Sequence, residues 1–572
     1  MERQPTTGGE AIINTLGQNG VEYVFGVSGG AALPMFDALR TTDTAIELIQ
    51  AIHEQGATHM ADGYARASGK LGVTLVTSGP GAGNTITGIM TAYMDSVAVA
   101  VICGQVPTTV IGEDAFQETN IIAISKPIVK HNHQATNPDE LSLELSRAIH
   151  IATTGRHRPV LFDVPKDVSQ NNISVVRSFE TPPSNTGDGS TVPDPNSVIA
   201  IADAWRQAKR PVILAGHGVL LAASSSELLQ LALQQETPVT TTLLGKGAIP
   251  ESHALSLGML GMHGTAYANK AIIEADFLLD VGSRFDDRIV GDAESFCKDA
   301  FIAHVDIDQR EIGKIITPNV GIQADARVFL KAMLGEMALG KTVDRSDWQK
   351  QLTEYKKDFP LSYETGNGLT MQRVIDETYK LTRGQAIVTA DVGQHQMWAA
   401  QFYKTERPNT WITSAGAGTM GFGLPAAIGA QLAKPNEQVI AFVGDGGFQM
   451  TMCELATACN QKLPIKIIIL DNSYLGMVRQ WQELHHDNRE IGVGMPGNPD
   501  FVKLAECYGA AGILIDSEDS LEAGLAQAFE ITDRPVVVHA KVRKTDNVYP
   551  MIPPGASYDK MLLGPPKNLS ID

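Results

Sequence analysis

The residue types and spacing best suited to chemistry occur in the segment GDGGFQMTMCELATACNQKLPIKIIILDN. A predicted strand over 439–443 runs into the motif GDGG (444–447), an amphipathic helix follows, and a second predicted strand ends at Asn472. In a right-handed strand–helix–strand unit, both strands end at the same edge of a parallel sheet. We therefore expect Asp445 and Asn472 to converge at that edge.

Both side chains offer oxygen atoms, which are the ligands that a hard Mg²⁺ ion prefers. The glycines around Asp445 let the backbone approach a phosphate closely, and the N-terminus of the following helix favours an anion. No lysine follows the glycines as it does in phosphate-binding loops, so a metal ion must supply the positive charge. The residues predict a magnesium–diphosphate site, although Gly-Asp-Gly alone is most often a simple strand-to-helix turn.

The whole construction resembles the cofactor motif of thiamine-diphosphate enzymes, in which GDG is followed further along by a pair ending in Asn. The resemblance implies thiamine diphosphate and Mg²⁺ as cofactors, with Asp445, Asn472 and the backbone carbonyl of Tyr474 as metal ligands. It also implies a set of cofactor contacts: Gly393, Gln394 and His395 on the diphosphate side, and Gly418, Met420, Gly444, Gly446, Gly447, Leu475, Gly476 and Met477 around the cofactor.

A second part of the cofactor site is expected near Glu54, in the segment AIHEQGATHMADGYARASGK. Thiamine catalysis needs a carboxylate on the aminopyrimidine ring, because the protein sets the tautomer of the ring and the cofactor carries the chemistry. Taken alone, Glu54 is an ordinary acid at a helix start, where the helix dipole favours it. With ADGYAR and TSGPGAGN (77–84) following, the segment resembles the pyrimidine-binding domain of the superfamily. The resemblance implies that Glu54 is the activating acid.

Met420 lies in the run SAGAGTMGFGLPAAIGA (414–430). A single methionine is usually core filler. However, GTMGFGLPAA resembles the family segment in which a bulky side chain holds the cofactor in its bent, reactive form. In the family, the half-sites that correspond to Glu54 and Asp445 meet across a subunit interface, so the resemblance implies a homodimer or homotetramer.

The resemblance narrows to one family over nearly the whole chain. FGVSGGA, HEQGA, GQVP, DAFQE, PKD, LGMLGMHGT, RFDDR, DIDQREIGK, DVGQHQMWAAQ, TMGFGLPAA, LGMVRQWQ and MIPPGAS occur in the order found in acetohydroxyacid (acetolactate) synthase catalytic subunits. That family decarboxylates pyruvate and joins the hydroxyethyl unit to pyruvate or 2-oxobutyrate, giving 2-acetolactate or 2-aceto-2-hydroxybutyrate and CO₂. We expect this activity, the first common step of valine, leucine and isoleucine biosynthesis.

The motif RFDDR (284–288) distinguishes this family from its relatives. Without context, the motif is as often a solvated charge cluster as a binding site. In the family its last arginine, Arg288 here, binds the carboxylate of the second 2-oxo acid, and an arginine fork suits a planar carboxylate. The other residues that the resemblance assigns to the reaction are Phe116, Met262 and Trp481 as substrate contacts and Gln117 and Lys166 as catalytic groups.

The middle third of the chain resembles the FAD site of the same family, in which the flavin is structural and takes no net part in redox chemistry. Catabolic acetolactate synthases lack both RFDDR and FAD, so the chain resembles the biosynthetic type. The residues that match positions around the flavin are Arg156, Gly216, Thr242, Leu243, His263, Arg284, Asp306 and Asp325.

Three α/β domains are expected to position these residues. Short β-branched runs alternate with helical patterns, as around 73–77, 211–216 and 464–472, and this alternation predicts parallel sheets flanked by helices. Two stretches are typical of joints, the Pro- and Ser-rich 179–198 and the charged 340–369. The expected parts are a pyrimidine-binding domain (1–178), a central FAD-binding-type domain (196–340), a diphosphate- and Mg²⁺-binding domain (370–550) and a C-terminal tail (551–572).

Composition argues against other partners. The 572 residues carry a formal net charge of −19, whereas nucleic-acid-binding proteins carry a basic stripe for phosphates. No apolar run approaches the ~20 residues of a membrane helix, and the N-terminus has no apolar signal core. The five cysteines are scattered, which is typical of reduced thiols. We therefore expect a cytoplasmic protein without membrane or nucleic-acid contacts.

Three alternatives remain. Pyruvate oxidase would consume oxygen and reduce its flavin, and glyoxylate carboligase lacks the activating glutamate that Glu54 provides here. A catalytically silent assembly partner belongs to a different class, and the loss of Glu54, Asp445 or Asn472 would have favoured it. The family also associates with a small regulatory subunit that senses valine or related products, which is a candidate partner.

Overall fold

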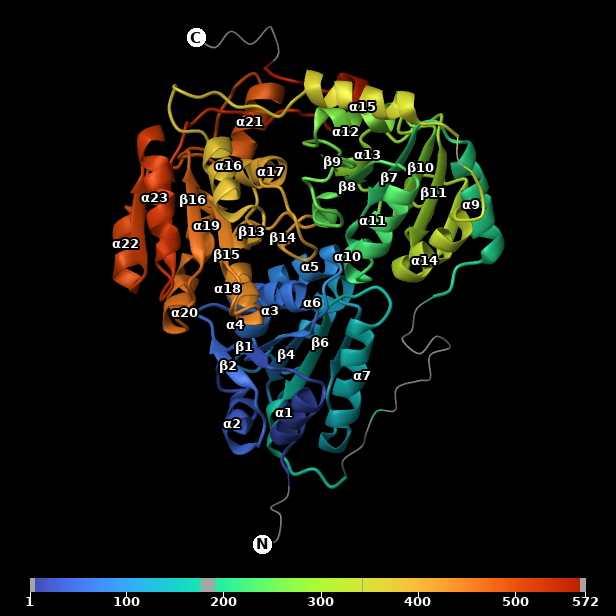
Figure 1. The fold of residues 1–572 in the computed structure, drawn as a ribbon. Helices are drawn as coiled ribbons and strands as arrows, with labels where there is room; N and C mark the ends of the chain where they lie inside the picture. Colours follow the sequence, from blue (N-terminus) through green and yellow to red (C-terminus); the bar gives the residue numbers. More distant parts are fainter. Residues whose placement is uncertain (1–5, 176–178, 180–190, 342, 566–572) are drawn as a thin grey trace.

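The computed structural model describes residues 6–175, 179, 191–341 and 343–565. These residues form three six-stranded sheets in which all paired strands are parallel, and helices flank each sheet (Figure 1). The predicted fold class of three α/β domains is confirmed. In the described part of the chain, no helix combines the length and the apolar character that crossing a membrane requires.

The first sheet has the strand order β2-β1-β3-β4-β6-β5. Strands β3 and β4 are buried throughout, because helices cover both faces of the sheet and every side chain of a central strand then faces the core. Its elements are β1 (Tyr23–Val27), β2 (Glu47–Gln50), β3 (Gly72–Val76), β4 (Val99–Gln105), β5 (His131–Gln134) and β6 (Val160–Pro165), with α1 (Gly8–Gln18), α2 (Leu33–Thr41), α3 (Glu54–Ser68), α4 (Pro80–Asn84), α5 (Ile86–Asp95), α6 (Ile121–Ser125), α7 (Leu141–Thr153) and α8 (Lys166–Gln170).

The second sheet has the order β12-β11-β10-β7-β8-β9. Its elements are β7 (Pro211–Ala215), β8 (Val239–Thr241), β9 (Ser256–Met259), β10 (Phe277–Val281), β11 (Phe301–Asp306) and β12 (Val320–Gln323), with α9 (Pro195–Gln207), α10 (His217–Leu221), α11 (Ser225–Gln234), α12 (Ala266–Glu274), α13 (Asp287–Val290) and α14 (Ala326–Met337). The stretch 340–369, expected as a joint, contains the helix α15 (Ser346–Asp358). Trp348 of α15 is buried and donates a hydrogen bond of 3.2 Å to the carbonyl of Pro211, which fixes this helix on the second sheet.

The third sheet has the order β14-β13-β15-β16-β18-β17. Its elements are β13 (Ile387–Ala390), β14 (Trp411–Thr413), β15 (Val439–Gly444), β16 (Lys466–Asp471), β17 (Ala511–Ile515) and β18 (Val536–Lys541), with α16 (Met371–Thr382), α17 (Gln394–Phe402), α18 (Gly423–Ala433), α19 (Asp445–Thr451), α20 (Leu455–Asn460), α21 (Gly476–His485), α22 (Phe501–Tyr508) and α23 (Glu518–Glu530). After β18 the chain returns to the second domain, where the backbone N–H of Ile552 donates to the carbonyl of Met262 (2.8 Å) and Tyr558 is buried. Most of the expected joint at 179–198, and residues 566–572 of the expected tail, lie outside the described residues.

The first and third domains pack directly on each other through α3 and α18 (Figure 1). Glycines make the close approach possible: a Cβ at Gly63 would overlap the backbone of Ala426, and a Cβ at Gly429 would overlap the carbonyl of Met60. Residues of both helices belong to one hydrophobic core. This contact fixes the carboxyl edge of the first sheet relative to the third.

A methyl group at Gly429 is expected to lower the free energy of unfolding by about 1–3 kcal/mol, because it forces two packed helices apart. Urea unfolding of Gly429→Ala measures this effect. The matched control is Gly335→Ala in α14, where a Cβ has no atom within 4 Å, and this change is expected to be neutral or slightly stabilising. An equal loss of unfolding free energy in the two variants would contradict the tight packing of α3 on α18.

Candidate active site between the three domains

A cavity of about 1630 Å³ lies where the three domains meet. It receives residues from the carboxyl edges of the second and third sheets, which is where ligands bind in α/β folds. Of the residues that the sequence identifies, those that line it are Arg156, Thr242, Leu243, Met262, His263, Arg284, Arg288, Asp306, Asp325, Gly393, Gln394, His395, Gly418, Met420, Gly444, Asp445, Gly446, Gly447, Asn472, Tyr474, Leu475, Gly476, Met477 and Trp481. The cavity therefore contains the expected diphosphate, acceptor and flavin residues together.

Asp445 and Asn472 meet at one edge of the third sheet, because β15 and β16 are adjacent and parallel. The Asp445 carboxyl is buried, and burial raises its pKa to about 7. Asn498 holds it in place, donating from Nδ2 to Asp445 (2.6 Å) and to Asp471 (3.0 Å). The oxygen of Asn472 accepts from the backbone N–H of Tyr474 at 3.2 Å. A cation at this point would restore the charged form of a carboxylate that burial disfavours.

A metal ion in this cavity would need ligands other than carboxylate, imidazole and thiolate side chains. Among the described residues, no group of three His, Cys, Asp or Glu side chains could hold an ion. The donors present are one carboxylate, one side-chain amide and backbone carbonyls, which is a set that Mg²⁺ accepts when phosphate oxygens complete its shell. The residues therefore fit Mg²⁺ together with a diphosphate.

Backbone without side chains surrounds the expected diphosphate position. A Cβ at Gly446 would lie 2.7 Å from Leu475, and one at Gly476 would lie 2.7 Å from the amide nitrogen of Asn472. The N–H of Gly444 donates to Nε2 of His395 at 3.1 Å, and burial lowers the pKa of His395 to about 3, so this ring is neutral. Gly446 and Gly476, together called the glycine cradle, leave no room for a larger side chain.

The loop that carries Gly418 and Met420 is held from two directions. In the third domain, the buried Asp391 carboxylate accepts from the backbone N–H groups of Gly421 (3.0 Å) and Gly423 (3.2 Å). From the first domain, the Asp95 carboxylate accepts from the N–H groups of Ala415 (3.1 Å) and Gly416 (2.7 Å). Met420 consequently lies next to the GDGG motif, with its methyl group 3.5 Å from a Cβ placed on Gly446.

Glu54 does not line this cavity. It begins α3 at the carboxyl edge of the first sheet and accepts a hydrogen bond of 2.9 Å from Asn84. Gln117 lies at the same edge, with its Cα 2.9 Å from a Cβ placed on Gly79. The remaining residues identified from the sequence that lie outside the cavity lining are Phe116, Lys166 and Gly216. The expected activating residues of the first domain thus form a separate group within one chain, at the edge where Phe116 is 88% exposed.

The expected acceptor residues are adjacent. The Arg288 guanidinium lies 5.9 Å from the centre of the Trp481 ring and 3.5 Å from the sulfur of Met262. The Arg288 carbonyl accepts from the N–H of Met262 at 2.8 Å, and Asp286 caps α13 by accepting from the N–H of Arg288. Arg288 is 57% exposed and its nearest carboxylate, Asp287, is 3.7 Å away, so most of its donors are free to bind an anion.

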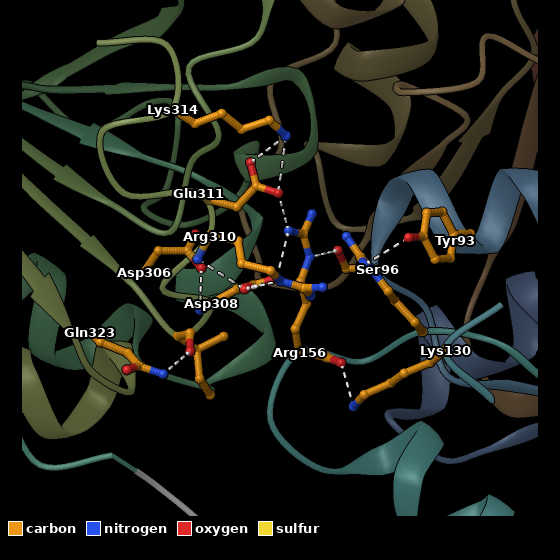
Figure 2. Close-up of polar contacts among 12 residues, drawn as sticks. Tyr93, Ser96, Lys130, Arg156, Asp306, Asp308, Arg310, Glu311, Lys314 and Gln323 are labelled. Atoms are coloured by element: carbon orange, nitrogen blue, oxygen red, sulfur yellow. Dashed lines mark hydrogen bonds and ion pairs between the residues drawn. The ribbon is translucent and has the colours of Figure 1, made fainter. Parts of the chain in front are cut away.

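The expected flavin end has a dense polar network (Figure 2). Arg156 donates to Ser96 (2.9 Å) within the first domain and to Glu311 (2.6 Å) of the second, and the bond to Glu311 attaches the two domains to each other. Asp306 accepts from the N–H of Asp308 at 2.7 Å, and burial raises its pKa to about 6.

His263 lines the same cavity. Burial lowers the pKa of His263 to about 4, and its Nδ1 has no partner among the described residues. Asp325 caps α14, accepting from the N–H groups of Arg327 (2.9 Å) and Val328 (3.1 Å). A polar atom without a partner, a carboxyl of raised pKa and a cavity of this volume are consistent with a large heteroaromatic ligand.

Several residues that build the site were not predicted. Asp391 directly follows β13 (Ile387–Ala390) in the structure, so its place at the end of an apolar run was an available signal. Asp95 and Asn498 had no such signal, because each acts by reaching a segment that is distant in the sequence.

Comparisons with known proteins agree with this geometry. Family models match three parts of the chain: "Thiamine pyrophosphate enzyme, N-terminal TPP binding domain" at residues 6–124, the central domain at 198–333 and the C-terminal TPP binding domain at 391–540. Fold and site together define a thiamine pyrophosphate (thiamine diphosphate) enzyme, and the predicted thiamine cofactor is confirmed at this level.

Similar proteins identify one family within this class of enzymes. The acetolactate synthase large subunit of Haemophilus influenzae is 43% identical to this chain, and the match covers 98% of this chain and 99% of the relative. The large subunit of Lactococcus lactis is 42% identical, over 98% of this chain and 96% of the relative. The large subunit of acetolactate synthase isozyme 3 of Escherichia coli is 42% identical, over 97% of this chain and 98% of the relative. The chain belongs to the acetolactate synthase large-subunit family.

Proposed function

We propose that the chain decarboxylates pyruvate and transfers the hydroxyethyl unit to pyruvate or 2-oxobutyrate, giving 2-acetolactate or 2-aceto-2-hydroxybutyrate and CO₂. This is the first common step of branched-chain amino acid biosynthesis. The observation that carries the proposal is the group Arg288, Trp481 and Met262, which opens into the same cavity as Asp445 and Asn472. A cation beside an aromatic face and a thioether suits a small carboxylate with an alkyl tail.

Thiamine diphosphate, when bound, supplies the nucleophilic carbon and accepts the electrons released by decarboxylation. The chain's own residues bind and orient it. Asp445, Asn472 and the Tyr474 carbonyl would hold Mg²⁺, and the glycine cradle with Gly393–His395 would receive the diphosphate. Met420, next to GDGG, would support the bent form, and apolar Met477 would keep water from the reacting carbon.

Glu54 would hydrogen-bond the pyrimidine ring of a cofactor held by a second copy of the chain. Glu54, Phe116, Gln117 and Lys166 would together complete that copy's cavity. The exposed edge of the first domain supports this proposal, since Phe116 (88% exposed), Ile52 (48%) and Met90 (37%) leave large apolar side chains uncovered there. The active form would then be a homodimer or homotetramer.

Mixing two inactive variants tests this arrangement. Chains with Glu54→Gln and chains with Asp445→Ala are unfolded and refolded together. If each site uses two chains, the mixed dimers regain one intact site each, and activity is expected to reach about a quarter of the parent value. Each variant refolded alone is the control. Absence of recovery, with mixed dimers demonstrated by differential tags, would place both residues in one chain.

FAD as a structural cofactor, a small regulatory subunit and a cytoplasmic location belong to the same proposal. The unpaired Nδ1 of His263 and the raised pKa of Asp306 support the flavin. The designation "large subunit" of the relatives supports the smaller partner. The five unpaired cysteines are consistent with a reducing compartment.

Product formation from pyruvate is the deciding experiment. Purified chain is supplied with thiamine diphosphate, Mg²⁺ and FAD, each is omitted in turn, and oxygen is monitored. Acetolactate and CO₂ that depend on thiamine diphosphate and Mg²⁺, without oxygen uptake, are expected. Acetate or acetyl phosphate with oxygen uptake would identify an oxidase, and an absence of turnover would identify a silent assembly partner.

Arg288→Ala is expected to weaken use of the acceptor about 10- to 100-fold, because a charge-assisted hydrogen bond is worth about 1.5–3 kcal/mol. Binding of thiamine diphosphate is expected to change little, since Arg288 belongs to the second domain and the expected metal and diphosphate residues belong to the third. Arg534→Ala, which removes an exposed arginine paired with its neighbour Asp533, is the matched control. Acceptor kinetics equal to those of the parent would remove Arg288 from the proposed role.

A further inference from the structure

Glu454 of the third domain reaches across to the start of α3 in the first domain. It follows α19 and precedes α20, and its side chain is fully buried. One carboxylate oxygen accepts from the backbone N–H of His53 at 2.9 Å, and the other accepts from that of Ile52 at 3.1 Å. Thr457 donates to the same carboxylate at 2.9 Å, so the group is held on its own domain as well.

These two N–H groups immediately precede Glu54. His53 is the N-cap residue of α3, and its ring nitrogen accepts from the N–H of Gln55 at 3.1 Å. Backbone N–H groups at a helix start have no partner within the helix, so an external acceptor fixes how the chain enters it. At α3 this acceptor belongs to another domain.

The fit around Glu454 leaves little freedom. Gly56, in the first turn of α3, lies so close that a Cβ would overlap the Glu454 carboxylate. The contact with Gly56 and the two hydrogen bonds together hold the first turn of the helix against Glu454. The direction in which Glu54 leaves the helix start depends on both.

We propose that Glu454 is a positioning residue for Glu54. It holds the first turn of α3 so that the Glu54 carboxylate is aligned with the pyrimidine ring that it activates. This inference rests on the proposed function of Glu54. Glu454 also belongs to the helical run that begins at Asp445, so one segment carries a metal ligand and sets the orientation of the activating acid.

If Glu454 had only a structural role, its loss would lower the stability of the protein without specifically slowing proton removal from the cofactor. The readout is the rate at which C2 of bound thiamine diphosphate exchanges its proton for deuterium, measured by NMR without pyruvate. Affinity for thiamine diphosphate and the unfolding midpoint are measured beside it. Glu454→Ala is expected to slow the exchange about 10- to 100-fold while the affinity changes less than about threefold.

The matched control is Glu251→Ala. Glu251 is also a buried carboxylate at a domain joint, where it accepts from the N–H of Thr405 (2.7 Å) and from Lys246 (2.6 Å). This variant is expected to lower stability and to leave the exchange rate unchanged. Glu454→Gln keeps one acceptor oxygen, so its exchange rate is expected to lie between those of the parent and Glu454→Ala. If Glu454→Ala does not fold, the exchange rate of Glu454→Gln tests the positioning role.

Glu54→Gln is measured in parallel to separate two failures. If Glu54→Gln exchanges as fast as the parent, the proposed role of Glu54 is wrong. If Glu54→Gln is slow but the Glu454 variants exchange like the Glu251→Ala control, Glu54 retains its role and the positioning role of Glu454 is overturned.

Discussion

Glu54→Gln is expected to lower kcat by about 10²- to 10⁴-fold, which is the range for loss of a positioned acid–base group. The amide keeps the size of the side chain but cannot share a proton with a ring nitrogen as a carboxyl group does. Affinity for thiamine diphosphate is expected to stay within a few-fold of the parent, because Asp445 and the glycine cradle lie in a different domain. Steady-state kinetics and equilibrium binding measure the two effects separately.

Glu47→Gln is the matched control, since Glu47 is an exposed acid on β2 of the same domain. Its kcat and cofactor affinity are expected to equal those of the parent. Full activity of Glu54→Gln would remove Glu54 from the mechanism. A parallel loss of cofactor affinity and kcat would instead show that Glu54 contributes mainly to binding.

Asp445→Ala is expected to reduce binding of thiamine diphosphate with Mg²⁺ by at least about 100-fold, since even outer-shell groups contribute 10- to 100-fold to metal affinity. Asp445 is the buried carboxylate at the carboxyl edge of β15, and the amide of Asn472 cannot replace its charge. Calorimetric titration with the cofactor measures the loss. In thermal unfolding, the stabilisation of the parent by thiamine diphosphate and Mg²⁺ is expected to disappear.

Asp487→Ala is the control for this change, because Asp487 is 86% exposed and its removal leaves β15 and β16 untouched. Asp445→Asn retains one oxygen ligand and is expected to bind more weakly than the parent and more tightly than Asp445→Ala. If the cofactor stabilises Asp445→Ala as strongly as it stabilises the parent, the metal site lies elsewhere in the cavity.

The diphosphate half of the site was predictable from the sequence because its two side chains lie at the ends of neighbouring strands. Asp445 and Asn472 end strands joined by one short helical crossover, and chirality alone brings such ends together. The fold class was predictable for a similar reason, since buried central strands such as β16 are continuous apolar runs. Arg288 and Trp481 come from different domains, and only the resemblance connected them in advance.

Other features depend on tertiary structure that no local pattern encodes. Strand β5 (HNHQ) is polar and lies at the edge of its sheet beside β6, while β8 and β14 have three residues each, so none of them carries a strand pattern. Helix α15 lies in a highly charged stretch, and it is packing of Trp348 that keeps it on the domain. The bonds from Asp95 and Glu454 join domains from opposite ends of the chain.

The packing of α3 on α18 has a consequence for how the chain is made. A ribosome completes α3 long before α18, so the part of α3 around Met60, which packs against Gly429 of α18, lacks this cover during most of synthesis. Contacts between such distant segments form slowly, and an uncovered apolar helix attracts other chains. The first domain therefore keeps an apolar helix surface uncovered until the last domain emerges, and the cavity, which is lined by residues of that last domain, can form only then.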